Sequence, residues 1–325
     1  MDVDNREPFS GGSQAYSGAR LERALTPEGQ RVVLKHLPAD GDWLTRATDG
    51  HGRARRLWES GALDAVAGTM EHSVIDVCRE DDHDVVVMAD VSEVLLPPDA
   101  RVARAEVECL LAGLARLHAD FEDAAPGGLC TPARRHSLFL PSFQRADDGP
   151  HPCRVRSLIV EGWELLAERW PGDVVHAVFA VHDALGLLER ELLRTAPSTL
   201  LHGDAKLDNL GLRGDRVVAV DWGELTGFGP AEMDVVWFAA TSTLVAPEAP
   251  TWRIDAMPDE VFAVYNAKAA RPLDPRTLDL ACLGIVAQLG WYLQLGDGAA
   301  RERTAQLDAW WKARVLVALE TWSPV

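Results

Sequence analysis

The chain has 325 residues, of which 47% are hydrophobic and 25% charged, as in ordinary folded proteins. A single core rarely grows beyond about 250–300 residues, so we expect two lobes. The net charge of −18 argues against a nucleic-acid partner, because such proteins carry a basic stripe. The same charge fits a cationic partner better than an anionic one, although its first effect is on solubility.

The five cysteines are scattered and form no CxxC pair. An odd, dispersed set predicts neither a disulfide framework nor a zinc knuckle, and it favours the reducing cytoplasm. The amino terminus, MDVDNREPFS, has no basic start and no apolar segment, so no signal peptide is expected. The most apolar stretch, 281–295, is shorter than the about 20 residues that a membrane span needs.

The first ninety residues are predicted to be mainly strands. β-Branched and alternating runs indicate strands at 19–25, 31–37, 74–77 and 85–88. The first two form a hairpin around the turn at 26–29, and the second strand carries Lys35. Leu57, Leu63 and Val66 have the spacing of a helix over 53–67.

The character of the chain changes near residue 90, so the expected lobes are 1–90 and 91–325. Pro97, Pro98 and Asp99 provide the start of a helix. Further helices are predicted at about 155–170, 174–196, 257–270, 276–296 and 303–322. The segment 122–153 is rich in proline and glycine and is expected to be a long functional loop, such as a lid or a substrate edge.

An irregular island at 199–229 interrupts the helical part. It contains His202-Gly203-Asp204 and Asn209, then two short apolar strands around an Arg-Gly-Asp turn at 213–215. The second of these strands ends at Asp221. A hairpin brings its ends together, so Asp204, Asn209 and Asp221 are expected to converge.

Two carboxylates and an amide oxygen suit Mg²⁺, which takes one or two carboxylates together with phosphate oxygens. A carboxylate that stays off the metal is able to accept a proton from a hydroxyl. The island therefore predicts a magnesium site beside a general base.

This pattern resembles the aminoglycoside phosphotransferase and choline kinase family, whose motif is H-G-D-x-x-x-x-N followed by an aspartate. The Leu114-Ala115-Arg116-Leu117-His118-Ala119 segment also resembles a family helix. The resemblance, over about residues 10–240, implies an α+β, two-lobed, protein-kinase-like fold. A small antiparallel-sheet N-lobe with one helix would bind ATP, and a larger, mainly helical C-lobe would carry the catalytic loop.

The resemblance also implies roles for individual residues. Asp204 would be the catalytic base, and Lys206 would reach the γ-phosphate. Asn209 and Asp221 would hold Mg²⁺, and Lys35 would grip the α- and β-phosphates of ATP.

Other nucleotide contacts are less well defined by the pattern. The phosphate loop does not follow G-x-G-x-x-G, and we favour Ser17 and Gly18 over the glycines at 11–12. Met88 and Asp90 would lie where backbone meets adenine. Glu59 is our candidate ion-pair partner for Lys35, with an exposed helix acid as the alternative.

Three acidic or basic neighbours of the motif are not expected to react. His202 would brace the loop through hydrogen bonds, and Asp234 would bind backbone amides of the catalytic loop. Asp208 is expected to be a solvated loop acid.

The predicted activity is ATP- and Mg²⁺-dependent phosphoryl transfer to a hydroxyl of a small polar acceptor, favoured to carry an amine. No A-P-E segment follows Asp221, so a protein substrate is not expected. The alternatives are an inactive nucleotide-binding pseudokinase, which the intact motif disfavours, and a metal-dependent hydrolase, for which further ligands are not found nearby.

Overall fold

The structure is a computed structural model, and it describes residues 3–9, 19–97, 100–244, 253–295 and 301–322. Strands come first along the chain and helices dominate after them. The described strands are β1 (Asp4–Phe9), β2 (Arg20–Leu25), β3 (Arg31–Leu37), β4 (Glu71–His72), β5 (Val74–Glu80), β6 (His83–Ala89), β7 (Thr199–Leu201), β8 (Leu210–Arg213), β9 (Arg216–Ala219) and β10 (Gly227–Gly229).

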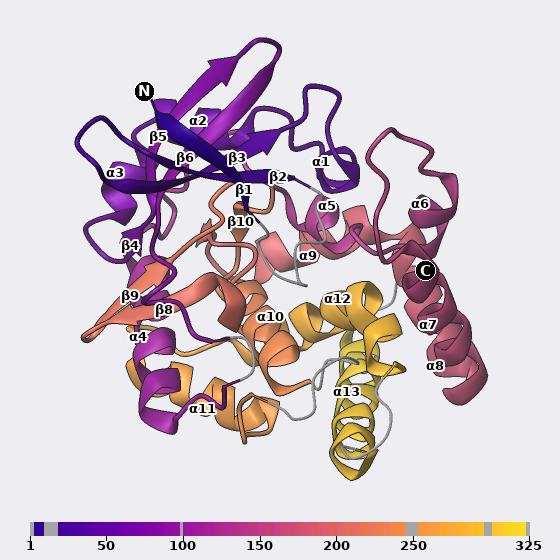
Figure 1. Cartoon of the computed structure of the whole chain (residues 1–325). Coiled ribbons are helices and arrows are strands. Elements are labelled where there is room, and N and C mark those ends of the chain that lie inside the picture. The colour runs from indigo at the N-terminus through magenta and orange to yellow at the C-terminus, as the bar shows by residue number, and fades with distance from the viewer. Residues whose placement is uncertain (1–2, 10–18, 98–99, 245–252, 296–300, 323–325) are drawn as a thin grey trace.

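The described helices are α1 (Trp43–Thr48), α2 (Arg53–Glu59), α3 (Ala62–Val66), α4 (Arg104–Asp120), α5 (Pro132–His136), α6 (Pro141–Ala146), α7 (Arg156–Arg169), α8 (Gly172–Asp183), α9 (Leu185–Thr195), α10 (Glu232–Thr243), α11 (Pro258–Lys268), α12 (Pro275–Leu293) and α13 (Arg301–Thr321), with a 3₁₀ turn, η1 (Leu207–Asn209). The expected α+β, two-lobed architecture is confirmed: a sheet lies over a mainly helical lobe (Figure 1).

The N-terminal sheet has the strand order β1-β2-β3-β6-β5, and all of its neighbouring strands are antiparallel. Strand β3 is central, and its 31–37 bounds are those predicted from the sequence. The helix expected over 53–67 is instead split into α2 and α3. Gly61 lies between them with φ +72°, a left-handed conformation that ends an α-helix and suits glycine.

The helix expected to start at Pro97 begins at Arg104, so that prediction was wrong. The chain before it runs along the β8–β9 hairpin, because the Leu96 amide donates to the Leu210 carbonyl at 3.1 Å and Leu95 forms a β-bridge with Gly211. The backbone groups there are satisfied by a strand rather than by a helix. The predicted loop over 122–153 contains the two short helices α5 and α6.

Helix α12 lies at the centre of the larger lobe, among α7, α10 and α13 (Figure 1). Almost every side chain from Leu278 to Leu293 is buried, which is the pattern of a helix surrounded by other helices.

The helix predicted at 174–196 is broken at Ala184 into α8 and α9. Within the described residues, no helix combines the length and the apolar character needed to cross a membrane.

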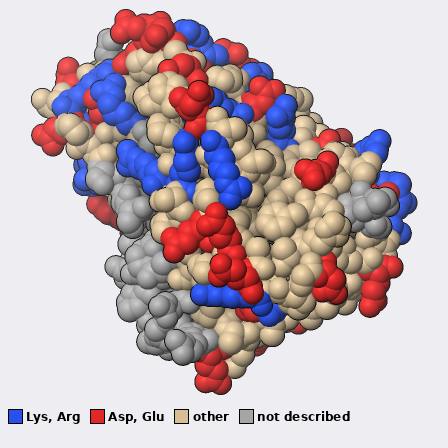
Figure 2. Space-filling model, turned by 90° about the vertical axis from the view of Figure 1, so that its right-hand side faces the viewer, with Lys and Arg blue, Asp and Glu red and all other residues tan. Residues whose placement is uncertain are grey.

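Charge is mixed on the face drawn in Figure 2, where groups of acidic side chains lie beside groups of basic ones. Neither sign covers that face alone. The net charge of −18 is therefore not gathered there into one acidic field.

Candidate active site

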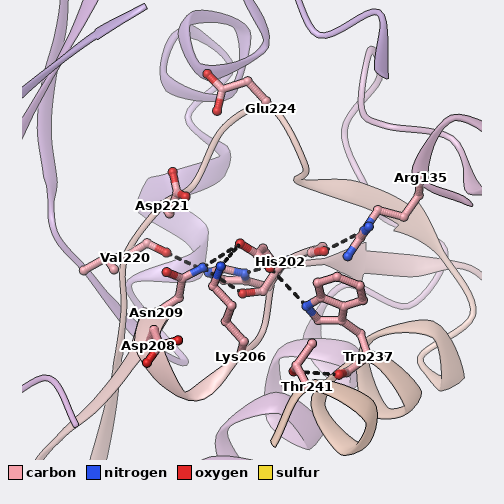
Figure 3. A network of polar contacts seen from close by, with 12 residues as sticks. Arg135, His202, Lys206, Asp208, Asn209, Val220, Asp221, Glu224, Trp237 and Thr241 are labelled. Carbon is pink, nitrogen blue, oxygen red and sulfur yellow. Dashed lines mark hydrogen bonds and ion pairs between the residues drawn. The ribbon is translucent and has the colours of Figure 1, made fainter. Parts of the chain in front are cut away.

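The catalytic island folds as the sequence predicted. Strands β8 and β9 form an antiparallel hairpin in which Leu210 pairs with Ala219 and Arg213 with Arg216. Gly214 makes the turn with φ +66°. The hairpin returns the chain to the loop at 202–209, so Asn209 and Asp221 lie at the same end of it (Figure 3).

The Asp204 carboxylate is held by donors on both of its oxygens. The Asn209 amide donates to Oδ2 at 2.9 Å, and Lys206 Nζ lies 3.3 Å from the same oxygen. The Trp237 indole donates to Oδ1 at 3.0 Å. Asp204 is only 7% exposed, so these bonds fix its position in a largely water-free site.

A glycine is required at position 203 because the backbone of Leu225 passes close to it. Gly203 adopts φ +80°, and a Cβ at this position would lie 1.8 Å from the Leu225 carbonyl oxygen. No other residue fits here without moving the segment after Asp221, which explains the glycine of the motif in physical terms.

Asp234, at the start of α10, holds the catalytic loop by its backbone, as predicted. Its carboxylate accepts from the amides of His202 at 2.7 Å and Gly203 at 2.9 Å. His118, from the helix α4, lies 3.4 Å from the same carboxylate. Burial opposes the charge, but His118 and the amides outweigh it and lower the pKa of Asp234.

His202 braces the loop, as the sequence suggested. Its Nε2 donates to the Val220 carbonyl at 2.9 Å, and the Asp204 amide donates to its Nδ1 at 3.2 Å. The ring also meets Trp222 edge to face at 4.6 Å. The histidine therefore links the loop that carries Asp204 to the strand that leads to Asp221.

Lys35 reaches across from the N-terminal sheet to the end of the hairpin. Its Nζ lies 2.5 Å from Asp221 Oδ1 and 3.3 Å from Glu224 Oε2. Burial opposes the ammonium charge, yet the two carboxylates outweigh it and raise the pKa of Lys35 above its usual value. Burial likewise acts against the Asp221 carboxylate, but Lys35 lowers the pKa of Asp221.

Glu59 does not pair with Lys35, so that assignment was wrong. Its side chain is exposed at the end of α2, beside the break at Gly61. Glu224 occupies the position instead and is 6% exposed. Glu224 lies 189 residues from Lys35 along the chain, so no local sequence pattern indicates the pairing.

The nucleotide contacts are placed only in part. Met88 is half-buried on β6 opposite Val33, and the Asp90 amide donates to the Arg31 carbonyl at 3.1 Å. The Asp90 carboxylate accepts from the Ser92 amide at 3.1 Å and lies near Arg23. Ser17 and Gly18 lie outside the described residues.

Asp208 is not a free solvated acid, which corrects the expectation for it. It is half-buried and forms an ion pair with Arg253 Nη1 at 2.5 Å. The pair ties the catalytic loop to the segment that precedes α11.

Two residues that were not predicted from the sequence, Arg135 and Trp237, contact the segment at Gly203 and Asp204. Arg135, on α5, donates from Nε to the Gly203 carbonyl at 2.7 Å, and its guanidinium stacks on the Trp237 ring at 3.9 Å. Trp237 is three residues after Asp234 on α10, so the two share one helix face. That spacing was the only available signal for Trp237, and nothing local pointed to Arg135.

The donor set suits a hard divalent cation. Asn209 uses its Nδ2 for the Asp204 carboxylate and carbonyl, which leaves its amide oxygen available. The Asp221 carboxylate is partly exposed and adopts φ +66°, a strained conformation that functional residues often show. An amide oxygen and a carboxylate are ligands that Mg²⁺ accepts together with phosphate.

A family model described as the phosphotransferase enzyme family matches residues 16–261, most of the chain. The chain belongs to the phosphotransferase enzyme family. The predicted class, a small-molecule kinase, is confirmed by this membership. No curated protein compared with the chain matches it.

Solved structures with the same fold share little sequence with the chain. Choline kinase LicA from Streptococcus pneumoniae has a TM-score of 0.55 at 12% identity, covering 99% of this chain and 95% of its own. An aminoglycoside phosphotransferase from Streptomyces rimosus, in complex with ADP and streptomycin, has a TM-score of 0.52 at 17% identity, covering 85% and 94%. A spectinomycin phosphotransferase, in complex with ADP and spectinomycin, has a TM-score of 0.51 at 12% identity, covering 98% and 94%.

Proposed function

We propose that the chain transfers the γ-phosphate of ATP to a hydroxyl of a small polar acceptor, with Asp204 as the general base. One observation carries the proposal: Asp204 is fixed by Asn209 and Lys206, while Asp221 at the same end of the hairpin meets Lys35. A base, a cation site and a phosphate-binding lysine are thereby gathered in one place.

The residues divide the work of phosphoryl transfer. Asp204 orients the acceptor hydroxyl and takes its proton, because its carboxylate is held in one orientation by several donors. Lys35 binds the α- and β-phosphates, and Lys206 meets the γ-phosphate. Asn209 and Asp221 would hold Mg²⁺, which when bound neutralises charge on the phosphate oxygens. Positioning and charge supply most of the catalysis in such reactions.

Glu224 adds a positioning role to this set. When Asp221 turns to a cation, Glu224 still holds Lys35 in place, because its carboxylate is buried 3.3 Å from Nζ. The adenine is expected to meet backbone between Met88 and Asp90, where the carbonyl of Asp90 is a candidate acceptor.

We expect an amine-bearing acceptor, because the chain has 50 acidic residues and only 32 basic ones. A negatively charged protein attracts a positively charged acceptor. The similar structures named above include a choline kinase and two phosphotransferases in complex with streptomycin and with spectinomycin. Neither a protein nor a nucleic acid is expected as substrate, and the cytoplasm is the expected location. The lobes 1–90 and 91–325 remain a prediction.

The test is ADP release from Mg²⁺-ATP in the presence of aminoglycosides, amino sugars, simple sugars and amino alcohols. One acceptor is expected to raise ADP release, and Asp204→Ala should reduce the rate by about 10²–10⁴-fold. Asp215→Asn, in the exposed turn of the same hairpin, is the matched control and should keep full activity. Near-normal turnover in Asp204→Ala would refute the base, and bound ATP without turnover for any acceptor would favour the inactive alternative.

A further inference from the structure

A polar cluster lies on the outer face of the N-terminal sheet, away from the candidate active site. Successive side chains of a strand point to opposite faces, so His36 points away from the side that Lys35 faces. The apolar end of this outer face forms a small second core, which contains Ala24, Val32, Leu34, Val85 and Val87. His36 continues the row that Val32 and Leu34 begin on β3.

Three potential metal ligands meet at the polar end of this row. His36 lies on β3, while Glu80 and His83 pair with each other across the β5–β6 hairpin. One ligand atom from each lies within 4.8 Å of the other two. The two imidazole nitrogens, His36 Nδ1 and His83 Nε2, are 3.0 Å apart. Two nitrogens bound to one tetrahedral zinc ion at 2.0–2.1 Å are about 3.3 Å apart, so a small shift suffices.

A carboxylate fixes the orientation of the central histidine. Glu22 Oε2 lies 2.9 Å from His36 Nε2, and the Arg20 guanidinium, which only donates, lies 3.0 Å from His36 Nδ1. Nε2 therefore carries the proton and Nδ1 presents its lone pair toward His83. A carboxylate behind the far nitrogen of a histidine is the usual support of a metal-binding imidazole.

Two arginines now neutralise the cluster. Arg20 contacts Glu22 and His36, and Arg6 contacts Glu80 at 2.6 Å. Both arginine side chains are substantially exposed, 60% and 36%, so both have room to turn toward solvent. His36 is buried, while Glu80 and His83 are partly exposed, so the arginines are the groups that can most easily leave the cluster.

We propose that His36, His83 and Glu80 form a binding site for a divalent transition-metal ion of the zinc type. Imidazole and carboxylate together select Zn²⁺ over Mg²⁺, whose preferred ligands are oxygens. The ion joins β3 to the β5–β6 hairpin one residue from Lys35. The site is independent of the proposed function, because it shares no residue with the candidate active site.

The test is a calorimetric titration of the full chain with Zn²⁺, without nucleotide, after removal of metals by a chelator. One Zn²⁺ ion is expected to bind per chain. Co²⁺ added in place of Zn²⁺ should give the visible absorption bands of a metal site of low symmetry. His83→Asn and Glu80→Gln should each weaken binding by at least about tenfold, and Glu22→Gln by about 10–100-fold. Arg20→Ala should strengthen binding, because it removes a competing cation.

Two matched variants decide the location. His176→Asn changes an exposed histidine on α8 and should bind as the wild type does. Asp221→Asn changes the candidate magnesium site and should also leave the zinc affinity unchanged. Loss of the ion in Asp221→Asn, unchanged affinity in His83→Asn, or no stoichiometric binding in the wild type would each overturn the proposal. Circular dichroism of every variant shows whether an effect arises from unfolding.

Discussion

The indole of Trp237 donates a hydrogen bond to Asp204 at 3.0 Å, from a helix that begins 28 residues after that aspartate. A hydrogen bond to a charged group contributes about 1.5–3 kcal/mol. The indole therefore helps to decide which way the carboxylate faces.

Trp237→Phe removes this donor and keeps an aromatic ring for Arg135 to stack on. We expect kcat to fall by about tenfold, with KM for ATP nearly unchanged, because the change affects the base and not the nucleotide contacts. Steady-state kinetics with the acceptor identified by ADP release provide the measurement. Trp310→Phe, at a half-buried position on α13, is the control, and an equal loss there would argue against a positioning role.

Glu224→Gln tests which acid supports Lys35. Removal of a buried carboxylate 3.3 Å from the ammonium leaves Lys35 less well placed, so KM for ATP should rise by about tenfold. Glu59→Gln should have no effect, since Glu59 is exposed on α2. Binding of ATP measured by calorimetry gives the same comparison without an acceptor. Equal effects of the two variants would contradict the assignment of Glu224.

Asp234→Asn tests how the catalytic loop is held. Loss of a buried, paired charge commonly costs about 3–5 kcal/mol, so the free energy of unfolding at pH 7 should fall by about that amount. The pKa of Asp234 is lowered in the folded chain, so its contribution is complete above the unfolded value of about 3.9 and is lost as pH falls further. In urea unfolding, the difference between wild type and variant should therefore begin to shrink below about pH 4 and continue to shrink as pH falls. A constant difference down to pH 3 would show that the carboxylate charge is not the cause.

His182→Gln tests a buried neutral histidine. Burial lowers the pKa of His182 to about 4, and its ring packs edge to face on Trp163 at 4.9 Å. As pH falls below about 6.5 the unfolded chain takes up the proton first, so stability declines until about pH 4, by about 3 kcal/mol. The variant should lose this part of the slope in urea titrations.

The control for this slope is His176→Gln, an exposed position on the same helix. It should keep the pH dependence of the wild type. A smaller slope should remain in His182→Gln, because burial also lowers the pKa of His136, to about 3. An unchanged slope in His182→Gln would mean that another group causes it.

The sequence was most informative where chemistry and local geometry coincide. Strand β3 and the β8–β9 hairpin follow from β-branched runs and a glycine turn, and Asp234 follows from its place at a helix start. Asp204, Asn209 and Asp221 were found because a hairpin joins them within 18 residues. Local patterns of this kind need no knowledge of the remaining chain.

The errors arose where a distant segment decides the outcome. Glu59 was plausible as a helical acid, but Gly61 ends its helix and Glu224 fills the place beside Lys35. Asp208 was predicted to be solvated, but in the structure it forms an ion pair with Arg253. No short-range periodicity encodes a contact between residues 45 or 189 positions apart.

The bridge between the two lobes has a mechanical consequence. Strand β4 pairs in parallel with β9, where His72 faces Ala219, two residues before Asp221. The connecting segment is also bound to β8, through Leu95 and Leu96. Two bodies that are joined at one point rotate relative to each other about that point. Because these contacts hold both segments to the β8–β9 hairpin beside Asp221, we expect any relative motion of the two lobes to be smallest there and to grow with distance from the hairpin.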